Sequence, residues 1–199
     1  SMARRKDLEL FAQKHSIKIG TIVDLIHYRI ANERTVSRME SHMLTTKYGE
    51  FMVHKYQDSI SGSIHLAYVK GKFGVDEPVL VRVHIPNTLR DICETHNKGR
   101  TSWSFNGALE QIANAGKGVA VLLSGDDYGQ TLEQNFLSTF AKESDSTSIN
   151  RSGNDLTIGT GSQILRDIGV GKMRLLGYPA RFNAISGFDL EVVEFVKFR

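Results

Sequence analysis

The chain has 199 residues, of which 40% are hydrophobic and 24% are charged, a balance typical of a globular protein. The formal net charge is +3, from 25 basic and 22 acidic residues, too small an excess to indicate nucleic-acid binding. No apolar run approaches the roughly 20 residues of a membrane-spanning helix. Cys93 is the only cysteine, which excludes an internal disulfide, and no secretory signal pattern opens the chain. We therefore expect a cytoplasmic protein with no nucleic-acid or membrane partner.

Residues 1–35 contain two short amphipathic segments. Asp7 can cap a helix with an apolar face over residues 8–15, and Thr21 can cap a second helix over residues 22–30. Each apolar face needs a surface to pack against. The pattern therefore predicts either an arm folded on its own domain or a connector to a neighbouring domain.

Short strands separated by turns are predicted over the next part of the chain, at residues 36–46, 51–56 and 64–69. They carry three histidines, His42, His54 and His65, which could bind a metal together, although solvent-facing strand histidines are commoner. Short strands of this kind suggest an antiparallel sheet or a partial barrel.

A buried strand, a polar loop, an amphipathic helix and a second buried strand follow at residues 79–123. Ser104 is a good N-cap, and Gly116 suits a left-handed helix end. The apolar face of the predicted helix consists of Phe105, Ala108, Leu109, Ile112 and Ala113. His84 ends the first strand, a position where ligand-binding groups often collect.

The C-terminal part begins with a polar stretch, 142–155, which its serine and asparagine content predicts to be a loop. Strands are expected near Met173 and over residues 190–195. Together with the earlier strands they predict a mixed β-sheet or partial barrel flanked by helices, of the α+β or α/β class.

Two family resemblances emerge from these segments. The stretches Leu8–His15 and Ile22–Arg29 resemble the end of dihydroxybutanone phosphate synthase, so residues 1–35 are identified as a connector from such a domain. Residues 36–199 resemble GTP cyclohydrolase II. The motifs behind the second resemblance are Arg82-Val83-His84, Ala108 to Ala113, Gly116-Lys117-Gly118, Gly161 to Val170, Met173 to Leu176 and Glu191 to Glu194.

The second resemblance implies a zinc ion held by three cysteine thiolates, which activates the water that opens the guanine ring. The corresponding positions are Asn87, Gly99 and Thr101, none of which can supply a thiolate. We therefore expect the zinc site to be lost and this domain to hold no metal. A remodelled site built from Cys93, His84 and His96 is the alternative.

The resemblance also implies basic and acidic residues that contact substrate and take part in catalysis. The family's arginine-rich run is replaced by a stretch containing Asp126 and Asp127, and the essential arginine and aspartate fall near Asn154 to Thr157, where Arg151 and Asp155 are displaced. We therefore expect no catalytic residue. The candidate ligand-binding residues that remain are Arg82, His84 and Arg181.

Three hypotheses follow for the function. The domain is a structural or regulatory module of a dihydroxybutanone phosphate synthase, a lyase for which magnesium is expected in the absent synthase domain. Alternatively it senses a nucleotide or flavin, or it is an enzyme with altered chemistry that uses Asp126, Asp127 and a recruited metal. The resemblance implies a homodimer and a synthase domain of the same chain as partners.

Overall fold

The computed structural model describes residues 5–20, 28, 33–95, 103–124, 132–133, 135–136, 151–177 and 189–198. The chain divides into two compact units, Ser1–Glu33 and Arg34–Arg199. None of the helices in these described ranges is long and apolar enough to cross a membrane.

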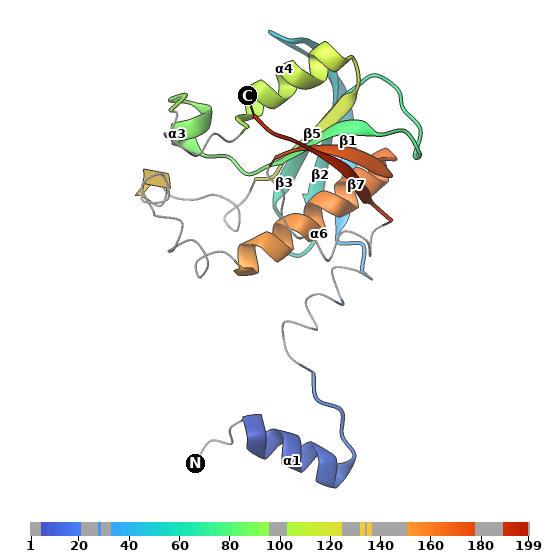
Figure 1. The fold of residues 1–199 in the computed structure, drawn as a ribbon, viewed down its shortest axis with the longest axis vertical. Coiled ribbons are helices and arrows are strands. Elements are labelled where there is room, and N and C mark those ends of the chain that lie inside the picture. The colour runs from blue at the N-terminus through green and yellow to red at the C-terminus, as the bar shows by residue number, and fades with distance from the viewer. Residues whose placement is uncertain are drawn as a thin grey trace. The chain divides into compact units, whose positions relative to one another are not determined.

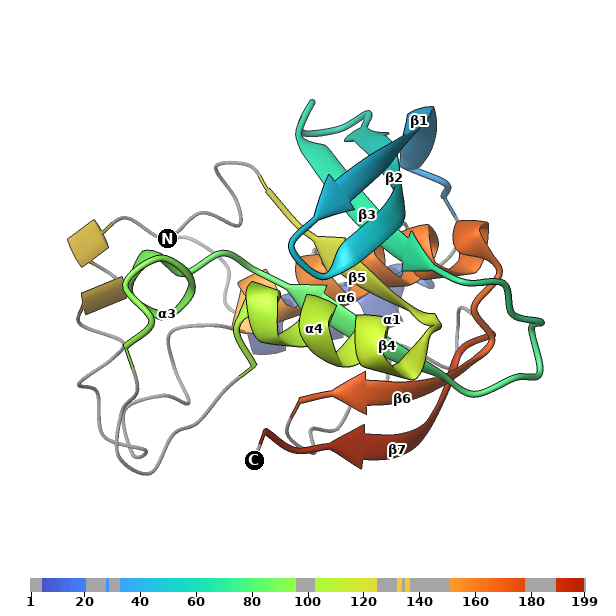
Figure 2. The same cartoon turned by 90° about the horizontal axis from the view of Figure 1, so that it is seen from above.

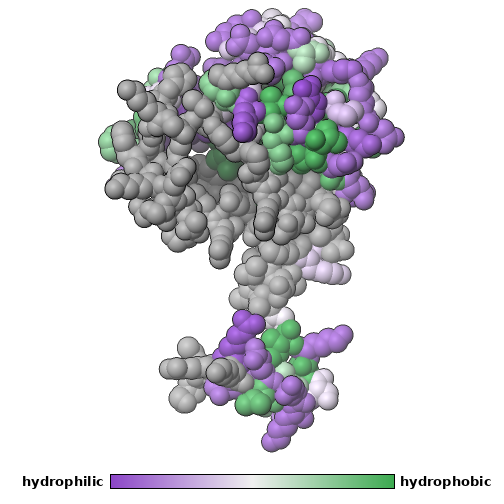
Figure 3. Space-filling view, viewed as in Figure 1, coloured by the Kyte–Doolittle hydropathy of each residue, from purple (hydrophilic) through white to green (hydrophobic). Residues whose placement is uncertain are grey.

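The first unit contains helix α1 (Arg5–His15). Asp7 was predicted to cap this helix, but the helix begins two residues earlier, so Asp7 lies in the first turn, where a carboxylate still favours the helix dipole. Ala12 is buried, whereas Leu8, Leu10 and Phe11 are 49–66% exposed, and Figure 3 shows hydrophobic side chains among hydrophilic ones on this unit. The predicted second helix, 22–30, lies outside the described residues except for Tyr28, which is helical.

The second unit is built on a seven-stranded sheet in the order β1-β2-β3-β5-β4-β6-β7. The strands are β1 (Val36–Thr46), β2 (Gly49–Asp58), β3 (Ile64–Lys70), β4 (Val79–His84), β5 (Gly118–Leu122), β6 (Lys172–Leu176) and β7 (Glu191–Val196). Neighbours from β1 to β5 pair antiparallel, and neighbours from β5 to β7 pair parallel. The predicted mixed sheet flanked by helices is confirmed (Figure 1).

Two helices, α4 (Phe105–Ala115) and α6 (Arg151–Ile168), cover opposite faces of the sheet (Figures 1 and 2). Helix α4 has the predicted ends: the Ser104 hydroxyl accepts a hydrogen bond from the Gly107 N–H, and Gly116 is left-handed with φ 75°. Its buried residues Ala108, Leu109 and Ile112 join a core with Phe51 and Leu80. This packing holds α4 against β4 and β5.

Two predictions are corrected by the second unit. Residues 151–155 were predicted to lie in a loop, but they form the first turns of α6, because polar residues are equally compatible with a loop and with the end of a helix. His65 is fully buried on β3 rather than facing solvent, and its Nδ1 accepts a hydrogen bond from the Ser124 N–H at 3.2 Å.

Candidate functional site at the end of strand β4

The loop that follows β4 folds back on the strand through a short helix, α3 (Thr88–Asp91). The Asn87 side chain caps this helix by accepting a hydrogen bond from the Arg90 N–H at 3.0 Å. One helical turn then separates the cap from Asp91, so the Asp91 carboxylate returns to the end of β4. The sequence Asn87-Thr88-Leu89-Arg90-Asp91 is thus a compact local motif that delivers a carboxylate to His84.

Asp91 accepts five hydrogen bonds. Its Oδ2 atom receives the His84 Nε2 at 2.8 Å, the Asn87 backbone N–H at 2.8 Å and the Arg90 Nη2 at 2.9 Å. Its Oδ1 atom receives the Arg90 Nε at 3.0 Å and the Phe105 backbone N–H at 3.1 Å. Burial alone would raise the pKa of Asp91, but the hydrogen bonds from His84 and Arg90 outweigh it and hold that pKa well below its usual range. Asp91 therefore stays ionised and ties together β4, its loop and the start of α4.

His84 is neutral at physiological pH. It is fully buried, and desolvation, assisted by the positive charges of Arg82 and Arg90, lowers its pKa to about 4. Because the Asp91 carboxylate can only accept, Nε2 must bear the ring proton, and Nδ1 is then free to accept from Arg82 Nε at 3.4 Å. The contact of His84 with Asp91 is therefore a hydrogen bond between a neutral ring and a carboxylate, not an ion pair.

Arg82 binds backbone carbonyls rather than a carboxylate. Its Nη1 donates to the Leu176 carbonyl at 2.8 Å, and its Nη2 donates to the Trp103 carbonyl at 3.2 Å. Desolvation and the nearby Arg90 lower the pKa of Arg82 to about 10, so the guanidinium keeps its charge. The site therefore carries one net positive charge in largely enclosed surroundings. It is the sum of the charges of Arg82, Arg90 and Asp91 around the neutral His84 ring.

The described donors do not fit a zinc site of the three-thiolate kind. Cys93, the only cysteine of the chain, is exposed, Asn87 caps α3, and His84 and Asp91 are bonded to each other. Within the described ranges, no three His, Cys, Asp or Glu side chains come together as metal ligands. Of the alternative site, His96 lies outside the described residues, as do Gly99, Thr101, Asp126 and Asp127.

The structure brings together two of the three predicted ligand-binding residues. Arg82 and His84 lie side by side on β4, whereas Arg181 is outside the described residues. Sequence reasoning missed Arg90 and Asp91, which the structure places on His84. The available signal was Asn87, an N-cap residue three positions before Arg90, which could have predicted the helical turn that carries both side chains back.

A second polar cluster holds the residues through which the chain enters the sheet. Gln163 of α6 accepts hydrogen bonds from the Thr35 and Val36 N–H groups at 3.0 and 3.2 Å. Asp167, one turn further on, accepts from Arg38 Nε at 2.9 Å and from the Tyr56 hydroxyl at 2.8 Å. These contacts fix the start of β1 on α6.

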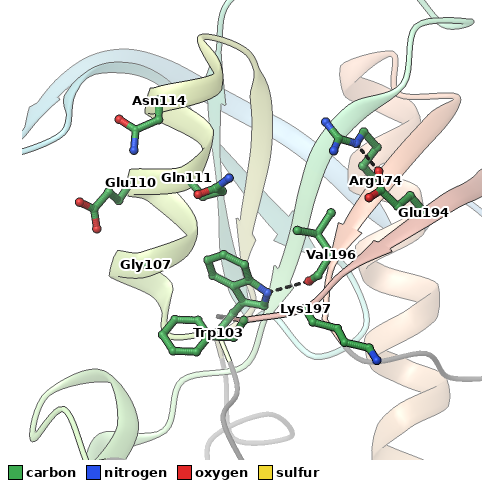
Figure 4. Close-up of a pocket in the computed structure, with 10 residues that line it drawn as sticks. Trp103, Gly107, Glu110, Gln111, Asn114, Arg174, Glu194, Val196 and Lys197 are labelled. Atoms are coloured by element: carbon green, nitrogen blue, oxygen red, sulfur yellow. Dashed lines mark hydrogen bonds and ion pairs between the residues drawn. The ribbon is translucent and has the colours of Figure 1, made fainter.

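A groove of about 640 Å³ lies between α4 and the strands β6 and β7 (Figure 4). Its lining includes Trp103, Gln111, Arg174, Glu194 and Phe198. The Trp103 indole N–H donates to the Val196 carbonyl at 2.9 Å, and Arg174 pairs with Glu194 at 2.5 Å. Trp103 lines this groove and also accepts a hydrogen bond from Arg82 at its carbonyl, so it contacts both the groove and Arg82.

These features can be compared with known proteins. Residues 37–197 match the family model "GTP cyclohydrolase II", which spans most of the chain. The protein therefore belongs to the GTP cyclohydrolase II family. Its seven-stranded mixed sheet with flanking helices agrees with that assignment.

The relatives are named as synthases or as a riboflavin biosynthesis protein. A 3,4-dihydroxy-2-butanone 4-phosphate synthase from Pseudomonas aeruginosa is 48% identical over 98% of this chain and 53% of its own length. The riboflavin biosynthesis protein RibBA of Aquifex aeolicus is 39% identical over 98% and 50%. A crystal structure of RibBX, a two-domain 3,4-dihydroxy-2-butanone 4-phosphate synthase from A. baumannii, matches with a TM-score of 0.69 and 41% identity, over 98% of this chain and 50% of that one. The chain spans about half the length of these relatives.

Proposed function

We propose that residues 36–199 form a GTP cyclohydrolase II-like domain without cyclohydrolase activity, which serves a 3,4-dihydroxy-2-butanone 4-phosphate synthase as a structural or regulatory module in riboflavin biosynthesis. The observation that carries this proposal is the donor set after β4. Water activation at neutral pH needs a metal centre, and the family's thiolates are replaced by Asn87, Gly99 and Thr101. The side chains that remain at the strand end, His84 and Asp91, are already bonded to each other.

Two further observations support a role beside a synthase domain. Relatives about twice as long bear the synthase name, and one of them has two domains. Helix α1 exposes Leu8, Leu10 and Phe11, an apolar surface that a preceding synthase domain would cover. On this proposal residues 1–35 connect the two domains, the parent protein is cytoplasmic and dimeric, and magnesium acts in the synthase part.

Deletion tests this function in a parent protein in which a synthase domain precedes residue 1. We expect removal of residues 36–199 to change the synthase rate, the assembly state or the thermal stability of the synthase part. A matched variant that keeps the domain but replaces Leu109 with Asp should reproduce the effect, because it unfolds the domain without shortening the chain. Identical rate, assembly and stability in all three proteins would refute the proposed role.

The second candidate function is the binding of an anionic ligand such as a nucleotide or flavin phosphate. The net positive charge around Arg82 and Arg90 favours it, since a largely desolvated guanidinium that pairs with no carboxylate of the described residues is stabilised by an anion. Calorimetry with GTP and flavin mononucleotide on the wild type and on Arg82→Met tests it. Binding that the substitution weakens at least about tenfold would support the site, since loss of a charged hydrogen bond costs that much. No heat of binding for either ligand would remove it.

A further inference from the structure

The loop after β4 in this family is expected to be organised by a bound metal cation. Here the hydrogen-bond acceptors of the loop converge on the Arg90 side chain instead. We infer that the Arg90 guanidinium is the internal cation of residues 85–95, the described part of this loop, and orders them in place of a metal ion, so that they keep their folded form without zinc. This inference rests on the proposed loss of the metal site and names what replaces it.

The geometry of Arg90 matches that role. Its Nε and Nη2 atoms bind the two oxygens of Asp91 as a fork, at 3.0 and 2.9 Å. Nη2 also donates to the Ile85 carbonyl at 2.8 Å and lies 3.1 Å from His84 Nε2. One planar cation therefore binds a carboxylate and a backbone carbonyl, two kinds of oxygen ligand that would also gather around a metal ion.

The charge balance explains why a metal and Arg90 exclude each other. Within the described residues, the carboxylate of Asp91 is the one acidic group placed against Arg90 and His84, and it already neutralises the Arg90 guanidinium. Among the described residues, a divalent ion there would face Arg90 and Arg82 with no carboxylate besides Asp91 against it. Repulsion between like charges at such distances opposes its binding.

The paired hydrogen bonds between Arg90 and Asp91 also stabilise the backbone at both ends of the loop. The Asp91 oxygens that Arg90 orients accept the Asn87 N–H at the start of α3 and the Phe105 N–H at the start of α4. The hydrogen-exchange rates of these two amide protons therefore measure directly whether the Arg90 guanidinium holds Asp91 in place. Replacement of a residue that only covered the surface would not change both exchange rates.

The test compares Arg90→Met, Arg90→Lys and the control Arg174→Met in the full chain. Arg174 is also an arginine paired with a carboxylate, Glu194, but it lies on β6. We measure metal content, the melting temperature with and without chelator, and hydrogen exchange at Asn87 and Phe105. Arg90→Lys keeps the charge but not the fork, and it provides the comparison if Arg90→Met fails to fold.

We expect no stoichiometric metal and no effect of chelator on the wild type. Exchange at both amides should accelerate about tenfold or more in Arg90→Met, the loss expected when hydrogen bonds to a charged group are broken, less in Arg90→Lys, and not in Arg174→Met. Stoichiometric zinc whose removal frees the two amides would overturn the inference. Exchange in both Arg90 variants within twofold of the wild type would overturn it as well. Neither result bears on whether the domain affects a synthase, which the deletion experiment decides separately.

Discussion

Mild acid should destabilise the domain through His84, and the magnitude follows from its surroundings. The pKa of the buried imidazole is lowered to about 4 from an ordinary value of 6.5. Between these two pH values the unfolded chain binds a proton that the folded state does not, so stability falls as the pH falls. One pH unit corresponds to about 1.4 kcal/mol, which gives about 3 kcal/mol in total for His84. Protonation of His84 therefore costs no folding stability above about pH 6.5 and costs the whole amount below about pH 4.

Asp91 acts in a different pH range. Its pKa is depressed in the folded state, so its contribution is present above the unfolded value of about 3.9 and is lost only below it. A comparison of pH 7 with pH 4.5 therefore isolates the histidine from its carboxylate partner.

The assay is urea unfolding at these two pH values for the wild type, His84→Gln and the control His42→Gln, an exposed histidine on β1. Burial also lowers the pKa values of His54 and His65, but both residues are present in every protein and cancel in the comparison. Because pH 4.5 still lies above the folded-state pKa of about 4, only part of the total is lost over this range, and we expect the wild type and His42→Gln to lose about 2.5 kcal/mol more than His84→Gln. Parallel losses in all three proteins would refute the assignment of a buried neutral imidazole.

Two further substitutions test the packing that positions the site. Leu109→Asp should abolish cooperative unfolding, because it places a charge in the core beneath α4 at a cost of several kcal/mol. The control Gln111→Asp, on the exposed face of the same helix, should melt like the wild type. A cooperatively melting Leu109→Asp protein would show that α4 is wrongly placed. Tyr56→Phe removes the hydroxyl that donates to Asp167 and should cost about 1 kcal/mol, or roughly 2–4 °C in melting temperature. An unchanged melting temperature would mean that the two arginines Arg34 and Arg38 hold Asp167 without the hydroxyl.

Much of the frame was predictable because it is encoded locally. Strands β1 to β5 follow runs of apolar or alternating residues, and each predicted strand lies within two residues of the observed one. The ends of α4 depend on Ser104 and Gly116, whose capping chemistry is local as well. The start of α6 was missed because its first turns are polar, and polarity does not separate a loop from a helix end.

The site was less predictable because its contacts join distant parts of the chain. His84 was singled out from its place at a strand end, but Asp91 meets both His84 and the amide of Phe105, 14 residues further on. Arg90 and Asp91 are adjacent charges in a polar loop, a pattern that usually means a solvated turn. Only the fold of the loop shows that one of them is the acceptor of five hydrogen bonds.

The most direct measurement is GTP turnover by the purified chain with added zinc and magnesium, followed by loss of GTP and release of formate and pyrophosphate. The proposal that the domain has lost cyclohydrolase chemistry predicts no turnover above the rate without protein, for the wild type and for Arg90→Met alike. Turnover that disappears with a chelator would contradict it, and Cys93, His84 and His96 would then be the first residues to replace.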